Sequence, residues 1–179
     1  EPAFMEFARS LPVKDIYKIV STCKPLSEIT QYKYSSSLRR HYEKLKHFPT
    51  GYLILGDALC SFNPVYGQGM TVASLEAKAI DELLKQKTPD DNLAKKFFNK
   101  AAKIIDIPWG MAVGEDFRFA ETKGPKPPAI TIINKYVTLV HKATLKDQEL
   151  CEAFLKVMSL LKPPTSLFHP KIAWRVVSP

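Results

Sequence analysis

The chain has 179 residues, of which 45% are hydrophobic and 25% charged, and its formal net charge is +8. This length fits one domain or one large part of a longer protein, and it can bury a core without disulfide or metal staples. No run of roughly 18 or more apolar residues occurs, so no transmembrane segment is expected.

The first part of the chain predicts two short helices followed by two strands. Apolar residues recur at helical spacing over 1–11 and again over 13–23, after which Pro25 blocks continuation. Strand-favouring residues alternate with polar ones over 27–36, and this period of two predicts a strand. The continuous apolar run "YLILG" at 52–56 predicts a second strand, of the kind that is covered on both faces.

Two helices and a loop are expected next. Over 69–84, rows of apolar and small residues form a wide apolar stripe, which predicts a largely buried helix. A further helix is expected over 88–105, where Pro89 and acidic residues suit a first turn. The segment 106–128 has no clear period and is rich in Gly and Pro, so we expect a long surface or active-site loop.

The C-terminal part predicts two more helices. Residues 129–144 combine β-branched residues, which favour a strand, with helical spacing, and their length favours a helix. Residues 147–162 form a helix with Asp147 as N-cap, ended by Pro163 and Pro164. Since two strands cannot make a stable sheet by themselves, the pattern indicates that a partner segment is missing.

The stretch "GYLILGDALCSFNPVYGQGM" at 51–70 raises the question of a dinucleotide-binding fingerprint. Such a fingerprint needs G-x-G-x-x-G or A directly after the first strand. Here ten residues separate Gly56 from Gly67, and no third small residue follows Gly69 at the required spacing. The stretch therefore fails as a classical Rossmann turn.

Its parts nevertheless suit a cofactor. Asp57, at the end of the expected strand, can accept hydrogen bonds from sugar hydroxyls, and Pro64 stiffens the loop. Gly67 and Gly69 let the backbone approach a flat ring closely. The helix that starts there directs its N–H groups and its positive end toward whatever precedes it.

The same stretch closely resembles the second FAD motif of flavoprotein monooxygenases of the para-hydroxybenzoate hydroxylase type. In that family a strand ends in Gly-Asp-Ala, a Pro follows, and a Gly-x-Gly begins a long helix. With its flanks over 35–77, and with 107–119 and 167–177, it is similar to a bacterial subgroup of FAD-dependent oxidoreductases or monooxygenases related to squalene and polyketide epoxidases. The resemblance covers nearly the whole chain from about residue 28.

The resemblance implies a set of FAD-binding residues. Asp57 would bond the ribityl or pyrophosphate region of FAD, and Pro64 would line the flavin ring near its reactive edge. Gly56 and Ala58 would allow close approach, and the backbone of 67–70 would face the pyrimidine side. The implied set is Gly56, Asp57, Ala58, Pro64, Gly67, Gln68, Gly69 and Met70.

The family's chemistry is reduction of FAD by NAD(P)H, reaction with O2 to a flavin hydroperoxide, and oxygen transfer to an organic substrate. The expected reactants are therefore O2 and an apolar or aromatic small molecule, with NAD(P)H as reductant. Because the cofactor carries this chemistry, no catalytic side chain is expected, and no nucleophile motif or acid–base pair is found in the sequence.

The family's N-terminal G-x-G-x-x-G, which holds the ADP half of FAD, is absent from the chain. We therefore expect an α/β fold, namely the helix-rich C-terminal portion of a two-domain Rossmann-like FAD-binding flavoprotein monooxygenase without its N-terminal ADP-binding βαβ unit. The expected division is the end of the substrate domain and a lead-in at 1–50, the FAD-binding strand-loop-helix segment at 51–87, and a helical region at 88–179. The missing N-terminal FAD-binding half is then a required partner, and the isolated chain is expected to be inactive.

An alternative is a non-enzymatic basic module that binds nucleic acid or a protein. The stretch 32–48 is rich in aromatic residues and contains Lys33, Arg39, Arg40, Lys44 and Lys46. A solvated charged face is the favoured interpretation, so no nucleic-acid binding is expected. Arg39 and Arg40 are weaker candidates for contact with a phosphate or NAD(P)H. A homodimer formed through the helical tail stays open.

The remaining residues suggest little further chemistry. The three cysteines, Cys23, Cys60 and Cys151, are far apart, which suits a reducing cytoplasm and argues against a disulfide framework. The histidines lack metal-ligand spacing, so no metal is expected. Trp109 and Phe117, in the expected loop, either line a substrate channel or anchor the loop.

Overall fold

The computed structural model describes residues 2–86 and 92–177. The chain divides into two compact units, Glu1–Ser35 and Ser36–Pro179, and each is described by itself. The expected opening of a helix at Pro89, and the expected boundary between 87 and 88, lie outside the described residues.

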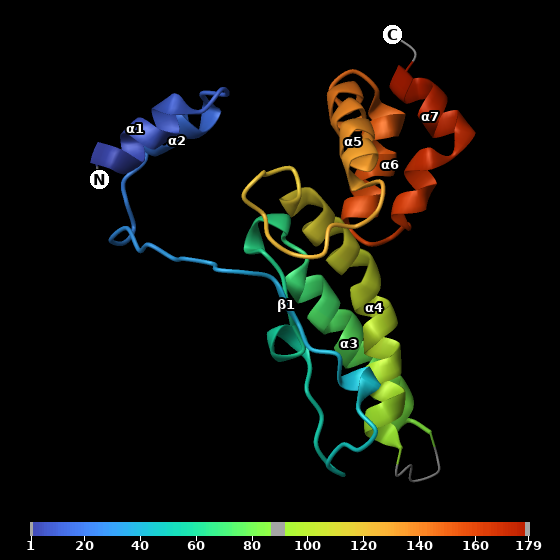
Figure 1. Cartoon of the computed structure of the whole chain (residues 1–179). Helices are drawn as coiled ribbons and strands as arrows, with labels where there is room; N and C mark the ends of the chain where they lie inside the picture. Colours follow the sequence, from blue (N-terminus) through green and yellow to red (C-terminus); the bar gives the residue numbers. More distant parts are fainter. Residues whose placement is uncertain (1, 87–91, 178–179) are drawn as a thin grey trace. The chain divides into compact units, whose positions relative to one another are not determined.

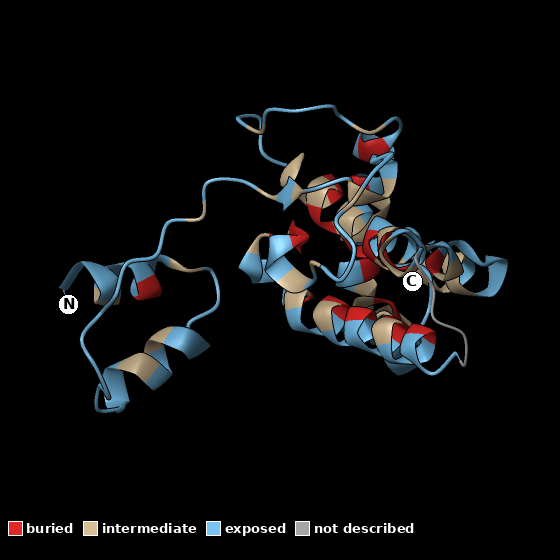
Figure 2. Ribbon diagram, turned by 90° about the horizontal axis from the view of Figure 1, so that it is seen from below, coloured by how far each residue is buried: buried red, intermediate tan, exposed pale blue. Residues whose placement is uncertain are grey.

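The first unit is a pair of short helices, α1 (Pro2–Ser10) and α2 (Asp15–Thr22), which pack against each other. Both predicted helices are thus confirmed. Arg9 donates a hydrogen bond to the Tyr17 hydroxyl at 2.7 Å and also lies 5.0 Å from its ring centroid, so it joins the two helices. Most side chains of this unit are exposed (Figure 2), as expected for so few residues.

The prediction of a strand over 27–36 is wrong, because this segment forms neither strand nor helix. Tyr32 is 79% exposed, so the alternating pattern has no covered face. The sheet in the described residues consists of β1 (Leu38–Arg39) and β2 (Cys60–Ser61), which pair antiparallel with Leu38 opposite Ser61.

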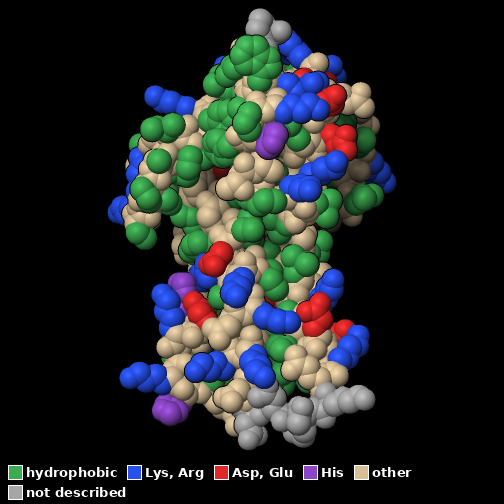
Figure 3. Space-filling view, turned by 90° about the vertical axis from the view of Figure 1, so that its right-hand side faces the viewer, with side chains coloured by type: hydrophobic (Ala, Val, Ile, Leu, Met, Phe, Trp, Pro, Cys, Tyr) green, Lys and Arg blue, Asp and Glu red, His purple; other side chains and the backbone are tan. Residues whose placement is uncertain are grey.

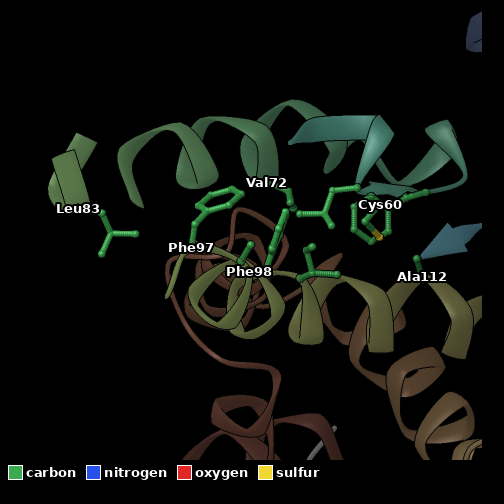
Figure 4. Packing of buried hydrophobic residues seen from close by; sticks show 10 residues of the cluster. Cys60, Val72, Leu83, Phe97, Phe98 and Ala112 are labelled. Carbon is green, nitrogen blue, oxygen red and sulfur yellow. The ribbon is translucent and has the colours of Figure 1, made fainter. Parts of the chain in front are cut away.

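The second unit is built on two long helices, α3 (Gly69–Leu84) and α4 (Leu93–Asp116), which lie side by side (Figure 1). The helix predicted over 69–84 is confirmed. Apolar side chains from both helices meet in one core, drawn in Figure 4, with Phe97 and Phe98 almost completely buried. Burying each such side chain contributes about 1.5–3 kcal/mol.

An aromatic cluster packs the segment 42–48 against this core. Tyr42 belongs to the 3₁₀ turn η1 (Tyr42–Lys44), and its ring lies 5.3 Å from that of Phe98. The ring of Phe48 meets Phe98 edge-on at 4.7 Å. Such contacts add stability beyond the area that they bury.

The expected α/β fold is wrong. The described residues are mainly helical, with a two-stranded antiparallel sheet of two residues per strand, so the unit is a small helical fold and not part of a two-domain Rossmann-like one. The strand expected at 52–56 is also absent, because within the described residues no neighbouring strand pairs with it. Leu53 and Ile54 instead pack against the edge of the helical core.

The long loop expected over 106–128 is wrong in its first half, because α4 continues through Pro108 to Asp116. Pro108 is buried inside the helix. Gly114 is buried as well, and a Cβ at this position would lie 2.8 Å from Cδ1 of Ile130. The Gly and Pro that read as helix breakers are therefore used for close packing.

The C-terminal part consists of α5 (Ile130–Thr144), α6 (Gln148–Met158), the 3₁₀ helix η4 (Pro164–Phe168) and α7 (Pro170–Val177). The helices predicted over 129–144 and 147–162 are confirmed. Asp147 is the N-cap of α6 as predicted, because its carboxylate accepts a hydrogen bond from the Leu150 N–H at 3.0 Å.

Side chains join these helices to each other and to α4. Tyr136 of α5 donates to the Leu167 carbonyl at 2.7 Å, and Asn134 donates to the Gly114 carbonyl at 2.8 Å. None of the helices in 2–86 and 92–177 has both the length and the apolarity needed to cross a bilayer.

Candidate functional site

The motif at Gly56–Met70 is a chain of tight turns that leads into α3. It contains the 3₁₀ turns η2 (Gly56–Ala58) and η3 (Pro64–Tyr66), with β2 between them. Gly56 and Gly67 have φ values of 64° and 65°, in the left-handed region that glycine adopts without strain. These two glycines therefore set the path of the backbone into and out of the motif.

A buried carboxylate holds the first of these turns. The Gly56 N–H donates to Oε2 of Glu76 at 2.6 Å, and the side chain of Glu76 lies inside the unit with no exposed surface. Oε1 of Glu76 has no hydrogen-bond partner among the described residues. Burial raises the pKa of this carboxyl, and the neighbouring Asp57 adds to the effect.

Asp57 lies beside the start of α3. It is exposed, and its Oδ1 would lie 3.7 Å from a Cβ placed on Gly69, the first residue of the helix. The N-cap residue of this helix, Gln68, makes no capping hydrogen bond through its side chain. The backbone N–H groups at a helix start lack partners within the helix, so those of Gly69 and Met70 can serve as donors beside the Asp57 acceptor.

The outer surface of the motif is open and apolar. Ala58, Pro64, Val65 and Met70 are all exposed, and Met70 has 84% of its surface accessible. The Asn63 side chain accepts from the Val65 N–H and so stabilises η3. This face therefore presents exposed apolar side chains beside the exposed Asp57 carboxylate.

Gln68 differs from the rest of the predicted set. It is 3% exposed and points away from the open face, with Nε2 donating to the Met158 carbonyl at 3.4 Å. Its Oε1 is buried and has no hydrogen-bond partner among the described residues. The expectation for Gln68 concerned its backbone, and its side chain lines a separate cavity.

That cavity is a pocket of about 400 Å³ between the second half of α4, α5, α6 and η4. Its walls are mainly apolar and include Met111, Val137 and Phe154, with Tyr66 and Gln68 at the side of the motif. This volume lies within the range of small-molecule sites, roughly 300–1,000 Å³. The pocket residues lie far apart in the sequence, so no local motif could have found them.

Hydrogen bonds fix the polar residues at the edge of this pocket. Tyr66 donates to Oδ1 of Asp116 at 2.8 Å, and burial followed by this hydrogen bond raises the pKa of the tyrosine above its ordinary value. Arg118 binds both carboxylate oxygens of Glu115. Met111, Glu115 and Asp116 carried no sequence signal, yet all three lie at or beside the pocket.

The other residues singled out from the sequence have structural roles. Cys60 is 2% exposed, and burial raises the pKa of its thiol to about 12, which makes it a packing residue. Arg39 forms an ion pair with Asp106 at 2.7 Å, and Arg40 donates to the Ala58 carbonyl. Trp109 packs against Phe62, so it anchors the core.

Among the residues in 2–86 and 92–177, no three His, Cys, Asp or Glu side chains gather in a way that could hold a metal ion.

Comparison with known proteins gives one informative match. No protein-family model matches the chain. Over 149 residues the chain is 32% identical to Protein Rv3254 of Mycobacterium tuberculosis (strain ATCC 25618 / H37Rv). The aligned region covers 79% of this chain and 31% of that protein. The chain thus spans about a third of the length of this relative, whose name states no activity.

Proposed function

We propose that this chain supplies the flavin-facing segment of an FAD-dependent monooxygenase that uses NAD(P)H and O2 to hydroxylate or epoxidise an apolar organic molecule. The observation that carries the proposal is the position of Asp57 beside the uncapped start of α3. An acceptor for ribityl hydroxyls and donors for the carbonyl edge of a flavin ring lie next to each other there.

The two left-handed glycines and the exposed Pro64 support the same interpretation. Gly56 and Gly67 give the motif its turns, and the exposed apolar surface around Pro64 could pack against an isoalloxazine ring. FAD would supply the redox and oxygen-transfer chemistry, whereas this chain's residues would hold and orient it. The helix N-terminus would stabilise negative charge on the pyrimidine side of the ring.

The rest of FAD needs further protein. The apolar residues Tyr52 and Leu55 just before the motif, and Val65 and Met70 within it, are exposed and offer a surface for such a partner. The ratio of this chain's length to that of its relative agrees with a larger polypeptide. On this proposal the chain alone is inactive, and the complete enzyme works in the cytoplasm.

The alternative of a nucleic-acid module is favoured less, because some of the residues that suggested it have structural roles. Of the residues that suggested it, Arg39 is paired with Asp106, and Tyr42 and Phe48 are partly buried against the core and so less open to base stacking, whereas Tyr32 is exposed. In Figure 3, Lys and Arg side chains on the visible face are interspersed with Asp and Glu rather than gathered into one basic patch.

The test is an FAD titration, followed by flavin fluorescence, of this chain and of the longest natural polypeptide that contains it. We expect saturable binding in the longer protein, weakened at least tenfold by Asp57→Ala. Asp81→Ala, an exposed position on the same helix, is the matched control. Failure of the longer protein to bind FAD, or equal affinity with and without Asp57, would contradict the proposal.

A further inference from the structure

The pocket between α4, α5, α6 and η4 has the dimensions of a ligand site rather than of a packing defect. Its volume of about 400 Å³ far exceeds the space of one water molecule. Its walls are held by specific hydrogen bonds, from Asn134 to the Gly114 carbonyl and from Tyr136 to the Leu167 carbonyl. The cavity is therefore a built feature of the unit.

The charges around this pocket are balanced. Glu115, the carboxylate in its wall, is bound by both Nε and Nη2 of Arg118. His141 packs edge-on against the Phe154 ring at 4.7 Å. A charged ligand would find no unpaired opposite charge among the described wall residues, so an uncharged molecule fits best.

One polar atom of the wall lacks a partner. Oε1 of Gln68 is buried and accepts no hydrogen bond from the described residues, whereas Nε2 of the same side chain donates to the Met158 carbonyl. Leaving a buried acceptor unpaired is costly, because it has given up its hydrogen bonds to water. A hydrogen-bond donor that enters the pocket, which Gln68 lines, would supply this partner.

We propose that this pocket binds an uncharged, largely apolar small molecule that carries one hydroxyl or N–H donor, which bonds to Oε1 of Gln68. The pocket is lined by Tyr66 and Gln68 on the side of the motif but needs no flavin to form. The site is thus separate from the open face of Asp57 and Met70, and binding to it does not depend on the proposed redox function.

The test uses two probes, 4-biphenylmethanol and its methyl ether, which differ in the donor. Binding to the full chain is followed by shifts of backbone and Gln68 side-chain amide signals in NMR spectra. We expect saturable binding of the alcohol, about tenfold tighter than that of the ether, since a buried acceptor gains its partner only from the alcohol. Gln68→Leu should lower the affinity for the alcohol to that for the ether, and it should leave the affinity for the ether unchanged.

A second variant tests the proposal independently if Gln68→Leu does not fold. Gly110 lines the pocket within α4, and a Cβ there meets nothing within 4 Å, so Gly110→Leu is chosen to narrow the cavity without a clash at its Cβ. It should lose both probes while retaining its thermal transition. Absence of saturable binding to the native chain, equal affinity for alcohol and ether, or undiminished binding in Gly110→Leu would each overturn the proposal. Titration of Gly110→Leu with FAD distinguishes failure of this proposal from failure of the flavin site. An FAD affinity equal to that of the native protein would show that the flavin site is intact.

Discussion

The backbone N–H of Gly56 donates a hydrogen bond to Oε2 of Glu76 at 2.6 Å and so ties the first turn of the motif to the middle of α3. The donor lies where the backbone has a positive φ, and the acceptor is a carboxylate without exposed surface. The position of Asp57, the next residue, therefore depends on a buried titratable group.

The first prediction concerns the pH dependence of stability. Burial raises the pKa of Glu76 above its ordinary value of 4.5. The folded state then binds more protons than the unfolded state, so the free energy of unfolding falls as pH rises through the window between 4.5 and the raised pKa. Glu76→Gln keeps the acceptor without the charge and should flatten this fall, as measured by urea denaturation at a series of pH values. Glu82→Gln, exposed on the same helix, is the control, and parallel curves for Glu76→Gln and the native chain would contradict the prediction.

The second prediction separates backbone strain from crowding in the motif. Gly56→Ala should lower the free energy of unfolding by about 1–2 kcal/mol, because a residue with a Cβ is strained in the left-handed region. Its Cβ would lie 3.8 Å from the Ala73 Cβ, which is an ordinary contact. Gly69→Ala has no such strain and should change stability little. Chemical denaturation measures both, and an equal loss in the two variants would show that the φ value is not the cause.

The third prediction compares two glycines of α4. Gly110→Ala should raise stability by about 0.5–1 kcal/mol, because its Cβ enters open space and alanine favours the helix. Gly114→Ala gains the same helix propensity but places its Cβ 2.8 Å from Cδ1 of Ile130. The second variant should therefore be the less stable of the two in thermal unfolding. The reverse order would mean that α4 and α5 are not packed as described.

The fourth prediction tests the link between α6 and α7. Arg175 lies 2.7 Å from Asp147 Oδ2, and this hydrogen bond, together with that from the Leu150 N–H, lowers the pKa of the aspartate below 3.8. Its stabilising contribution is present above pH 3.8 and is lost as pH falls through the lowered pKa. Asp147→Asn keeps the cap acceptor but loses the ion pair, so its thermal midpoint should lie below that of the native chain at neutral pH. The two midpoints should converge in acid, and a constant difference would contradict the assignment.

Periodicity in the sequence found the helices that carry a clean apolar stripe, such as α3 and α6. It also found the first half of α4, but it missed the second half, where Pro108 and Gly114 suggested a loop although both are buried inside the helix. It also failed for the strands at 27–36 and 52–56, because a strand needs a paired neighbour that a local pattern cannot reveal.

The candidate site likewise contains residues that the sequence could reveal and residues that it could not. The turn glycines and Asp57 lie in one short stretch, so their spacing could be read directly from the sequence. Gln68 lies within that stretch as well, but its side chain turns inward to Met158, ninety residues along the chain. The pocket depends on such long-range contacts between α4, α5 and α6, which no local signal encodes.

The most direct test of the account is amide hydrogen exchange of the longest natural polypeptide that contains this chain, with and without FAD. The account predicts that FAD slows exchange at the amides of Asp57 and Ala58 and at those of 67–71, where α3 begins without a cap. Exchange in α6 and α7 should not change. Protection confined to other segments, or none between 56 and 71 at saturating FAD, would contradict the central claim that this motif faces the flavin.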